Sequence, residues 1–241
     1  MKSISAIGVM VLALFLVSFS TLLSAEATGG ASTTPAESGA AVFSYRPPVR
    51  GAPASRVGGG SRGTAEITGE LAVLAPDHTG LTTSSQPTLY WYLSEPANAR
   101  LDVTVTDDRN IDPLLEQVIG IPKSAGIQSL DLAKAGATLK PGVEYRWFVS
   151  LTPDEKQRSN DVVASGTIEY VKPDAALASK VASADALAQA RIYAEDGIWY
   201  DALDSLSRAI AQNPNDSSLH AQRAAMLEQV GLKSAADYDR K

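Results

Sequence analysis

Few residues in this chain have the chemistry that catalysis or metal binding requires. The 241 residues include no cysteine and only two histidines, His78 and His220. These counts exclude disulfides, thiolate nucleophiles, zinc–cysteine centres and three-histidine metal sites. His78 follows Asp77, as an acid–base pair would, but both lie among turn-forming residues, so we expect an exposed histidine. His220 has no acidic neighbour in the sequence, and neither histidine is predicted to be catalytic.

Other motifs that carry chemistry are incomplete. No serine occurs in G-x-S-x-G. Residues 58–63 fit G-x-G-x-x-G, but a nucleotide site needs a strand before this loop and a helix after it, and here a proline-rich segment precedes a predicted strand. A weaker alternative is an anion-binding concavity of glycine N–H groups and arginines. Four aspartates lack the spacing and closing glutamate of a calcium loop: Asp102, Asp107, Asp108 and Asp112. The sequence therefore predicts no cofactor, no metal site and no enzyme, with a dispersed carboxylate pair as the open alternative.

Surface recognition has better support. In residues 88–93, three apolar side chains alternate with Tyr90 and Tyr92, which must face outward if the others face inward. In residues 145–151, Arg146 and Phe148 likewise occupy the outward positions of the alternation. Exposed aromatic side chains on a sheet can bind sugars or a partner protein. The alternative is that the helical C-terminal part covers one of these faces. The candidate interaction surface comprises Tyr90, Tyr92, Arg146, Phe148, Trp199 and Tyr200.

The elements that would position these residues begin with a run of short strands. Turn-forming residues separate seven segments of period-two alternation, which predict an antiparallel β-sandwich over residues 64–172. A local resemblance at residues 139–145 implies that this sandwich is of the fibronectin type III or immunoglobulin-like class. Residues 139–145 resemble the turn before the sixth strand of a fibronectin type III-like domain, which makes Tyr145 a structural anchor rather than a catalytic phenol. The seven segments are 71–74, 88–93, 101–106, 116–119, 127–132, 145–151 and 162–170.

A helical tail follows over residues 173–241. Its period predicts helices over 173–195, 199–211 and 217–230, the last capped by Ser217 or Ser218. The spacing of small and large residues from Ala190 to Pro214 resembles one tetratricopeptide unit, although Ala186 and Gln189 replace its usual tryptophan and leucine. About one and a half units cannot form a solenoid, so we expect the helices to dock on the sandwich through Trp199 and Tyr200.

The amino-terminal region has the pattern of a targeting sequence followed by a linker. Residues 1–27 have the basic start, apolar run and small-residue cleavage site of a secretory signal peptide, with an uncleaved membrane anchor as the alternative. Residues 28–63 are rich in Gly, Pro, Ser and Arg and predict a flexible segment. The net charge of -6 argues against nucleic-acid binding.

The order of these pieces resembles a bacterial family known as the domain of unknown function 928. The matching segments are Tyr45-Arg46-Pro47-Pro48, Gly51-Ala52-Pro53, residues 56–63, residues 71–76, Pro87-Thr88-Leu89-Tyr90-Trp91-Tyr92, residues 142–147 and residues 193–203. The resemblance implies an exported envelope protein of Gram-negative bacteria, without assigned catalytic residues. It also implies that part of the Arg/Gly-rich segment is ordered.

These observations together predict an uncharacterised protein of the periplasm or cell envelope. The absence of a catalytic constellation favours a non-enzymatic interaction or scaffold module that binds envelope proteins. A glycan- or peptidoglycan-binding module that uses Tyr90, Tyr92 or Phe148 is the alternative. Contact with the membrane is expected only through an uncleaved signal segment.

Overall fold

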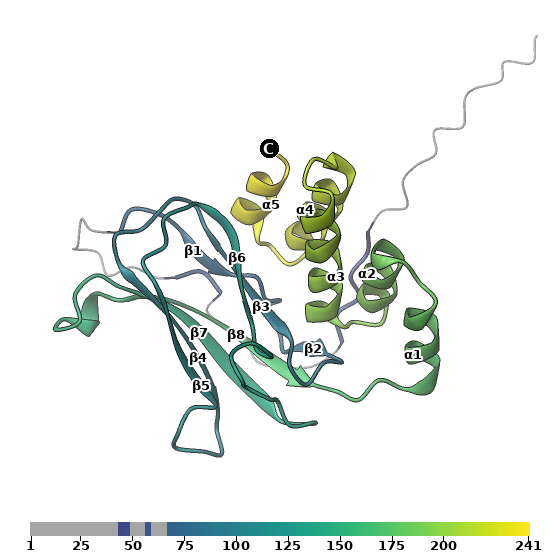
Figure 1. Ribbon diagram of the computed structural model, residues 1–241, viewed down its shortest axis with the longest axis horizontal. Helices are drawn as coiled ribbons and strands as arrows, with labels where there is room; N and C mark the ends of the chain where they lie inside the picture. The colour runs from purple at the N-terminus through teal and green to yellow at the C-terminus, as the bar shows by residue number, and fades with distance from the viewer. Residues whose placement is uncertain (1–42, 49–55, 59–66) are drawn as a thin grey trace, which may run out of the picture. The chain divides into compact units, whose positions relative to one another are not determined.

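The computed structural model describes residues 43–48, 56–58 and 67–241, which form a mixed β and α fold (Figure 1). Within these ranges, eight strands in two sheets precede five α-helices. The predicted signal peptide and its cleavage site lie outside the described residues. In the described ranges, no helix combines the length and the apolar character that crossing a membrane requires.

The smaller sheet has three antiparallel strands in the order β1-β3-β6, which are Leu71–Val73, Thr88–Leu93 and Gly126–Asp131. The larger sheet has five strands in the order β2-β8-β7-β4-β5. In chain order these are β2 Gly80–Thr82, β4 Arg100–Asp107, β5 Leu115–Gly120, β7 Glu144–Thr152 and β8 Val162–Tyr170. All seven predicted strand segments are therefore strands, and their inward alternation builds a shared core.

Strand β2 departs from the predicted antiparallel arrangement, because it pairs in parallel with β8. The chain leaves β1 at Val73, passes Pro76, and adds residues 80–82 to the edge of the larger sheet. Residues 76–88 are rich in turn-forming Pro, Asp, Gly and Ser, so the sequence does not indicate this three-residue strand. The larger sheet is consequently mixed.

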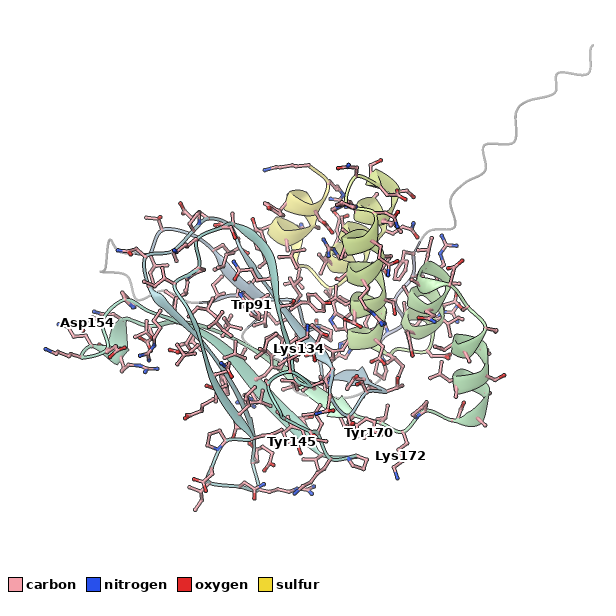
Figure 2. All side chains as sticks on the ribbon, viewed as in Figure 1. Trp91, Lys134, Tyr145, Asp154, Tyr170 and Lys172 are labelled. Carbon is pink, nitrogen blue, oxygen red and sulfur yellow. The ribbon has the colours of Figure 1, made fainter. Side chains whose placement is uncertain are left out.

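Large aromatic side chains fill the space between the sheets. Trp91 and Trp147 are almost fully buried, as their inward alternation predicts. Figure 2 shows Trp91 within the packed body of the sheets, whereas Asp154 lies in the loop between β7 and β8. The hydroxyl of Tyr145 accepts a hydrogen bond from the backbone N–H of Lys140 at 3.1 Å, five residues upstream. This bond confirms Tyr145 as an anchor of the turn that enters β7.

The helical tail contains two more helices than predicted. Residues 173–195 form two helices because Asp185 caps a new one, accepting a hydrogen bond from the N–H of Ala188. Asp216, rather than Ser217 or Ser218, caps α4. The last helix was missed because its seven residues are too short for a clear period. The helices are α1 Ala175–Ala182, α2 Ala186–Glu195, α3 Trp199–Gln212, α4 Ser217–Gln229 and α5 Lys233–Asp239.

The N-terminus of α3 joins the helices to both sheets. Trp199 donates a hydrogen bond from Nε1 to the carbonyl of Leu74, just after β1, at 2.9 Å. The Tyr200 hydroxyl donates to the carbonyl of Thr167 on β8 and accepts from Trp147 Nε1. The side chains of Trp199 and Tyr200 are almost fully buried, as expected for residues that dock the helical tail on the sheets. Burial raises the pKa of Tyr200, so this phenol remains protonated and a hydrogen-bond donor.

Part of the predicted flexible segment is packed instead. In the strap, residues 43–48, the N–H of Arg46 bonds to the carbonyl of Ala194, and the ring of Tyr45 meets that of Trp199 edge-on. Gly197 approaches this strap so closely that a Cβ would lie 2.8 Å from the carbonyl oxygen of Arg46. Composition indicated flexibility because it carries no information on partners that lie far along the chain. The other residues of the predicted flexible segment, apart from 56–58, lie outside the described ranges.

Candidate functional site

The aromatic residues expected to form an exposed surface on β3 are covered. Tyr90 and Tyr92 are only 8% and 5% exposed. The Tyr90 hydroxyl donates to Asp204 Oδ1 on α3 at 2.8 Å, and the Tyr92 ring lies 5.5 Å from that of Tyr238 on α5. The alternative that helices cover this face is therefore correct. The expectation of a freely exposed Tyr90–Tyr92 surface is wrong, because alternation defines the faces of a strand but not what packs on them.

The other four predicted surface residues divide into two pairs. Trp199 and Tyr200 lie in the buried joint between α3 and the sheets. Arg146 is exposed and Phe148 is half-buried on β7. Phe148 lies opposite Thr104 of β4, on the strand face that points away from the core.

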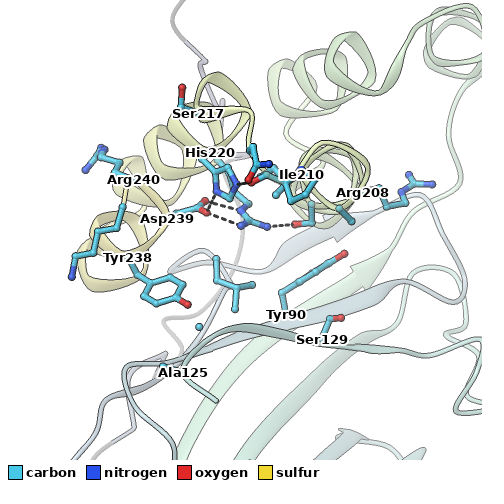
Figure 3. A pocket seen from close by; sticks show the side chains of 18 residues that line it. Tyr90, Ala125, Ser129, Arg208, Ile210, Ser217, His220, Tyr238, Asp239 and Arg240 are labelled. Atoms are coloured by element: carbon cyan, nitrogen blue, oxygen red, sulfur yellow. Dashed lines mark hydrogen bonds and ion pairs between the residues drawn. The ribbon is translucent and has the colours of Figure 1, made fainter. Parts of the chain in front are cut away.

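A cleft of about 870 Å³ lies where α3, α4 and α5 face β3 and β6 (Figure 3). The strands contribute Tyr90 and Ser129, and the end of α5 contributes Tyr238. The helices contact the smaller sheet at the aromatic joint, where Trp199 bonds to the Leu74 carbonyl, and at the Tyr92–Tyr238 ring contact. Between these two contacts, polar side chains line the cleft.

One wall of the cleft is a hydrogen-bonded network across three helices. Asp239 receives two hydrogen bonds from Arg223, each of 2.7 Å, and Arg223 also donates to Ser207. Arg223 and Asp239 are both buried, so their mutual pairing offsets the cost of removing two charges from water. Figure 3 shows these bonds at the edge of the cleft. The network therefore fixes the positions of polar groups before any ligand arrives.

His220 belongs to the same wall, where it has an acidic partner although it has no acidic neighbour in the sequence. Its Nδ1 lies 2.8 Å from Asp239 Oδ1, and its Nε2 lies 3.1 Å from the carbonyl oxygen of Pro214. Both partners accept hydrogen bonds, so only the doubly protonated ring can donate to both. Asp239 follows nineteen residues later and reaches His220 only because α5 folds back onto α4.

A second cavity of about 730 Å³ shares Tyr90, Ser129 and Arg208 with the first. Hydroxyl groups of threonines, serines and tyrosines form much of its lining. Arg208 forms an ion pair with Asp204 at 2.9 Å, yet its side chain is 62% exposed. Asp201 accepts hydrogen bonds from the N–H and hydroxyl of Thr83, while burial raises the pKa of its carboxyl. The two cavities therefore adjoin at Tyr90, Ser129 and Arg208, and together they are called the groove.

His78 is less exposed than its turn position indicated, because the strap covers it. Its side chain is 13% exposed, Nδ1 lies 3.1 Å from Asp77, and Nε2 lies 2.8 Å from the Tyr45 hydroxyl. The hydrogen bond with His78 lowers the pKa of Asp77, and burial raises that of Tyr45. A carboxylate, an imidazole and a hydroxyl in this order could relay a proton, but Tyr45 is buried against Trp199. The arrangement instead holds the strap.

The four aspartates considered for calcium have local structural partners or remain dispersed. Asp102 pairs with Arg100 at 3.0 Å, and Asp107 caps its own turn through Arg109 N–H and Asn110. The hydrogen bond from Asn110 lowers the pKa of Asp107. Among the residues that the structure describes, no three His, Asp or Glu side chains are grouped to hold a metal ion.

Strand β5 forms an open edge of the larger sheet. In the described sheet it pairs only with β4, and Val118, Ile119 and the following Ile121 are 59%, 41% and 57% exposed. The register shifts between Leu101 and Asp102, which leaves Ile119 unpaired as a β-bulge. Val118 lies opposite Asp102 on the outward face. An apolar edge with unpaired backbone groups can accept another strand.

A protein-family model, Domain of Unknown Function (DUF928), matches residues 57–239. The chain belongs to the DUF928 family. No curated protein matches the chain. The DUF928 match includes both sheets, all five helices and most residues of the cleft, so the groove lies within the family's own domain. The Phe43–Pro48 strap precedes the matched region.

Sequence reasoning missed several residues that line the groove in this DUF928 protein. Arg208, Arg223 and Asp239 lie on three different helices, and each resembles an ordinary charged position of an amphipathic helix. Tyr90 was identified, but as a surface residue rather than as the floor of a covered groove. No local sequence signal distinguishes these residues, because their association depends on how the helices pack on β3 and β6.

Proposed function

We propose that this DUF928 protein is exported to the bacterial envelope and acts there as a non-enzymatic module that binds another protein. The edge of β5, which exposes Val118 and Ile119 and pairs only with β4 among the described residues, is the single observation that carries the proposal. The signal-peptide pattern of residues 1–27 supports export. A fibronectin type III-like origin of the sheets, for which the Tyr145 hydrogen bond is the support, and a tetratricopeptide-like helical part belong to the same proposal.

The edge of β5 has few of the features that usually prevent strand addition. Natural edge strands carry lysine or proline, or are covered by another element. Residues 115–120 contain neither lysine nor proline, and their single charge is Glu116. The bulge at Ile119 protects only the end of the strand, so residues 115–118 retain a regular edge. An extended segment of a partner can bond to this backbone and place apolar side chains against Val118.

Charge favours one kind of partner. The turn from β4 into β5 carries Asp107, Asp108 and Asp112 against Arg109 alone. An added strand that runs past this turn is favoured when it carries basic residues at that end. The occupant of the edge is therefore an extended, apolar segment of another protein, with lysine or arginine at one end. Phe148, on the outward face of the same sheet, extends the contact surface.

Site-specific photo-crosslinking in intact cells tests this proposal. A crosslinking residue replaces Ile121, next to the edge, and in a matched strain it replaces the exposed Gln212 at the end of α3. We expect a discrete crosslinked species from position 121 alone. Val118→Lys in the position-121 protein places a charge on the edge and lowers the yield about tenfold. Gln212→Lys in the same protein is the control and leaves the yield unchanged.

Two results would contradict the proposal. One is a crosslinked yield that Val118→Lys leaves intact, because the edge would then not be the contact. The other is a species of twice the protein's own mass, which would assign the edge to self-association rather than to a foreign partner. Thermal unfolding of the Val118→Lys protein checks that the variant is folded; its exposed position predicts a transition close to that of the wild type.

A further inference from the structure

We infer that the groove between the helices and the smaller sheet binds a saccharide that carries a carboxylate. This site is separate from the β5 edge. In the larger sheet β5 is the edge strand opposite β2, and no residue of β5 lines either cavity. Its two cavities, of about 870 and 730 Å³, share Tyr90, Ser129 and Arg208. Each volume lies within the range of small-molecule sites, and together they suit an elongated ligand of a few sugar rings.

The lining has the mixture of groups that sugar recognition requires. Sugars present hydroxyl groups around their edges and C–H groups on their faces, so their sites combine fixed polar side chains with aromatic rings. The Tyr90 ring forms the floor where the cavities meet, and Tyr238 points into the cleft from α5 (Figure 3). Ser129, Ser207 and the hydroxyl-rich second cavity supply donors and acceptors.

The polar groups in the wall are held in place without a ligand. Arg223 is fixed by Asp239 and Ser207, and His220 is fixed by Asp239 and the Pro214 carbonyl. A buried Arg–Asp pair with two parallel hydrogen bonds has little freedom to rearrange. A site whose side chains are already ordered loses less conformational entropy when its ligand binds.

The charges of the first cavity favour an acidic sugar. Its lining includes four cationic side chains and one carboxylate, Asp239, although the whole chain has a net charge of -6. Arg208 also pairs with Asp204, and Arg240 pairs with Glu228 and Asp237, so the cationic excess is smaller than this count. The second cavity is lined by three aspartates, so the ligand carboxylate belongs in the first cavity. Asp239 is already engaged by Arg223 and His220, so it does not repel an incoming anion as an isolated carboxylate would. Arg208, at the junction of the cavities, is 62% exposed and can turn its guanidinium toward a ligand carboxylate. The cationic residues are Arg208, Arg223, Arg240 and Lys241.

Binding measurements with defined oligosaccharides test the inference. The carboxylated probes are trigalacturonate, a hyaluronan tetrasaccharide and N-acetylglucosaminyl-N-acetylmuramic acid, with maltotriose as the neutral probe, each titrated into the full chain by calorimetry. We expect at least one carboxylated probe to bind more tightly than maltotriose. Its affinity should fall as salt rises, because counterions screen the attraction of the arginines for its carboxylate.

Variants then locate the site. Ser129 is exposed on the floor, so Ser129→Trp fills the groove without disturbing the core and lowers affinity at least about tenfold, or about 1.4 kcal/mol. Arg208→Ala lowers the affinity about as much and weakens the salt dependence of the affinity. This variant tests the site if Ser129→Trp fails to fold. Ser159→Trp, an equal change on an exposed loop outside the groove, leaves affinity unchanged.

Two results would overturn the inference. One is that none of the three carboxylated probes binds more tightly than maltotriose. The other is that Ser129→Trp and Arg208→Ala bind the best probe as well as the wild type does. The result is independent of the proposed protein contact, because Val118→Lys leaves sugar affinity unchanged and Ser129→Trp leaves the crosslinked yield unchanged.

Discussion

The two ends of α3 meet the rest of the molecule in opposite ways. At its N-terminus, Trp199 and Tyr200 are buried against both sheets, and their polar atoms bond to Leu74, Thr167 and Trp147. Toward its C-terminus, Ser207 and Arg208 face a polar groove instead of a packed interface. One helix thus forms a closed aromatic joint at one end and leaves an open, charged space at the other.

This difference separates the residues that hold the molecule together from those available for recognition. Burial of large aromatic rings stabilises the joint, and the polar atoms of Trp147, Trp199 and Tyr200 each have a hydrogen-bond partner. The groove keeps the buried Arg223–Asp239 pair, although buried ion pairs contribute little net stability compared with well-packed apolar side chains. Stability therefore explains the joint well, whereas ligand recognition is a better reason for the polar network.

The largest effect is expected at the joint. Tyr200→Ala removes a fully buried ring between Trp147 and Gly80 and lowers the free energy of unfolding by about 3–5 kcal/mol. Urea unfolding followed by tryptophan fluorescence and far-UV circular dichroism measures the loss. Tyr200→Phe is the control that keeps the ring, and it costs only about 1–3 kcal/mol for the lost hydrogen bonds. A loss below 1 kcal/mol for the alanine variant would show that the ring does not join helices and sheets.

A somewhat smaller effect is expected in the groove wall. Asp239→Leu leaves Arg223 buried without its carboxylate and lowers the free energy of unfolding by about 3 kcal/mol. The double variant Arg223→Met/Asp239→Leu removes both charges and is expected to recover most of this stability. The same urea measurements compare the two proteins. If the double variant is as unstable as the single one, the network contributes to folding rather than being retained for recognition.

The smallest effect is expected at the strap. Tyr45→Phe removes the hydrogen bond to His78 but keeps the ring against Trp199, so the free energy of unfolding falls by only about 1 kcal/mol. Deletion of residues 1–48 removes the ring as well, exposes Trp199 to solvent and red-shifts its fluorescence. An unchanged emission spectrum after this deletion would contradict the packing of the strap on the joint.

The sequence predicted features that depend on neighbours along the chain. Alternation located seven strands, and the turn before Tyr145 predicted its role as a structural anchor. Features that depend on distant partners were missed. Strand β2 is only three residues long, and the strap is ordered by α2, α4 and His78, which follow it by many residues. Flexible composition cannot reveal such partners.

The groove shows the same limit. The sequence assigned Tyr90 to an outward face, and the structure places helices over that face without filling the space completely. His220 and Asp239 are separated by nineteen residues and by the turn from α4 into α5, a helix that was not predicted. Residue type and local spacing therefore identified parts of the groove but could not assemble them.

The central claim, that one end of α3 is a closed joint and the other an open binding groove, is tested most directly by hydrogen–deuterium exchange. Exchange is measured on the full chain with and without the tightest-binding carboxylated oligosaccharide. The account predicts slower exchange in peptides from residues 125–129, 207–211 and 217–223, and no change in residues 144–152, which carry Trp147 of the joint, or in residues 115–120. Unchanged exchange around the groove, or protection confined to the β5 edge, would contradict it.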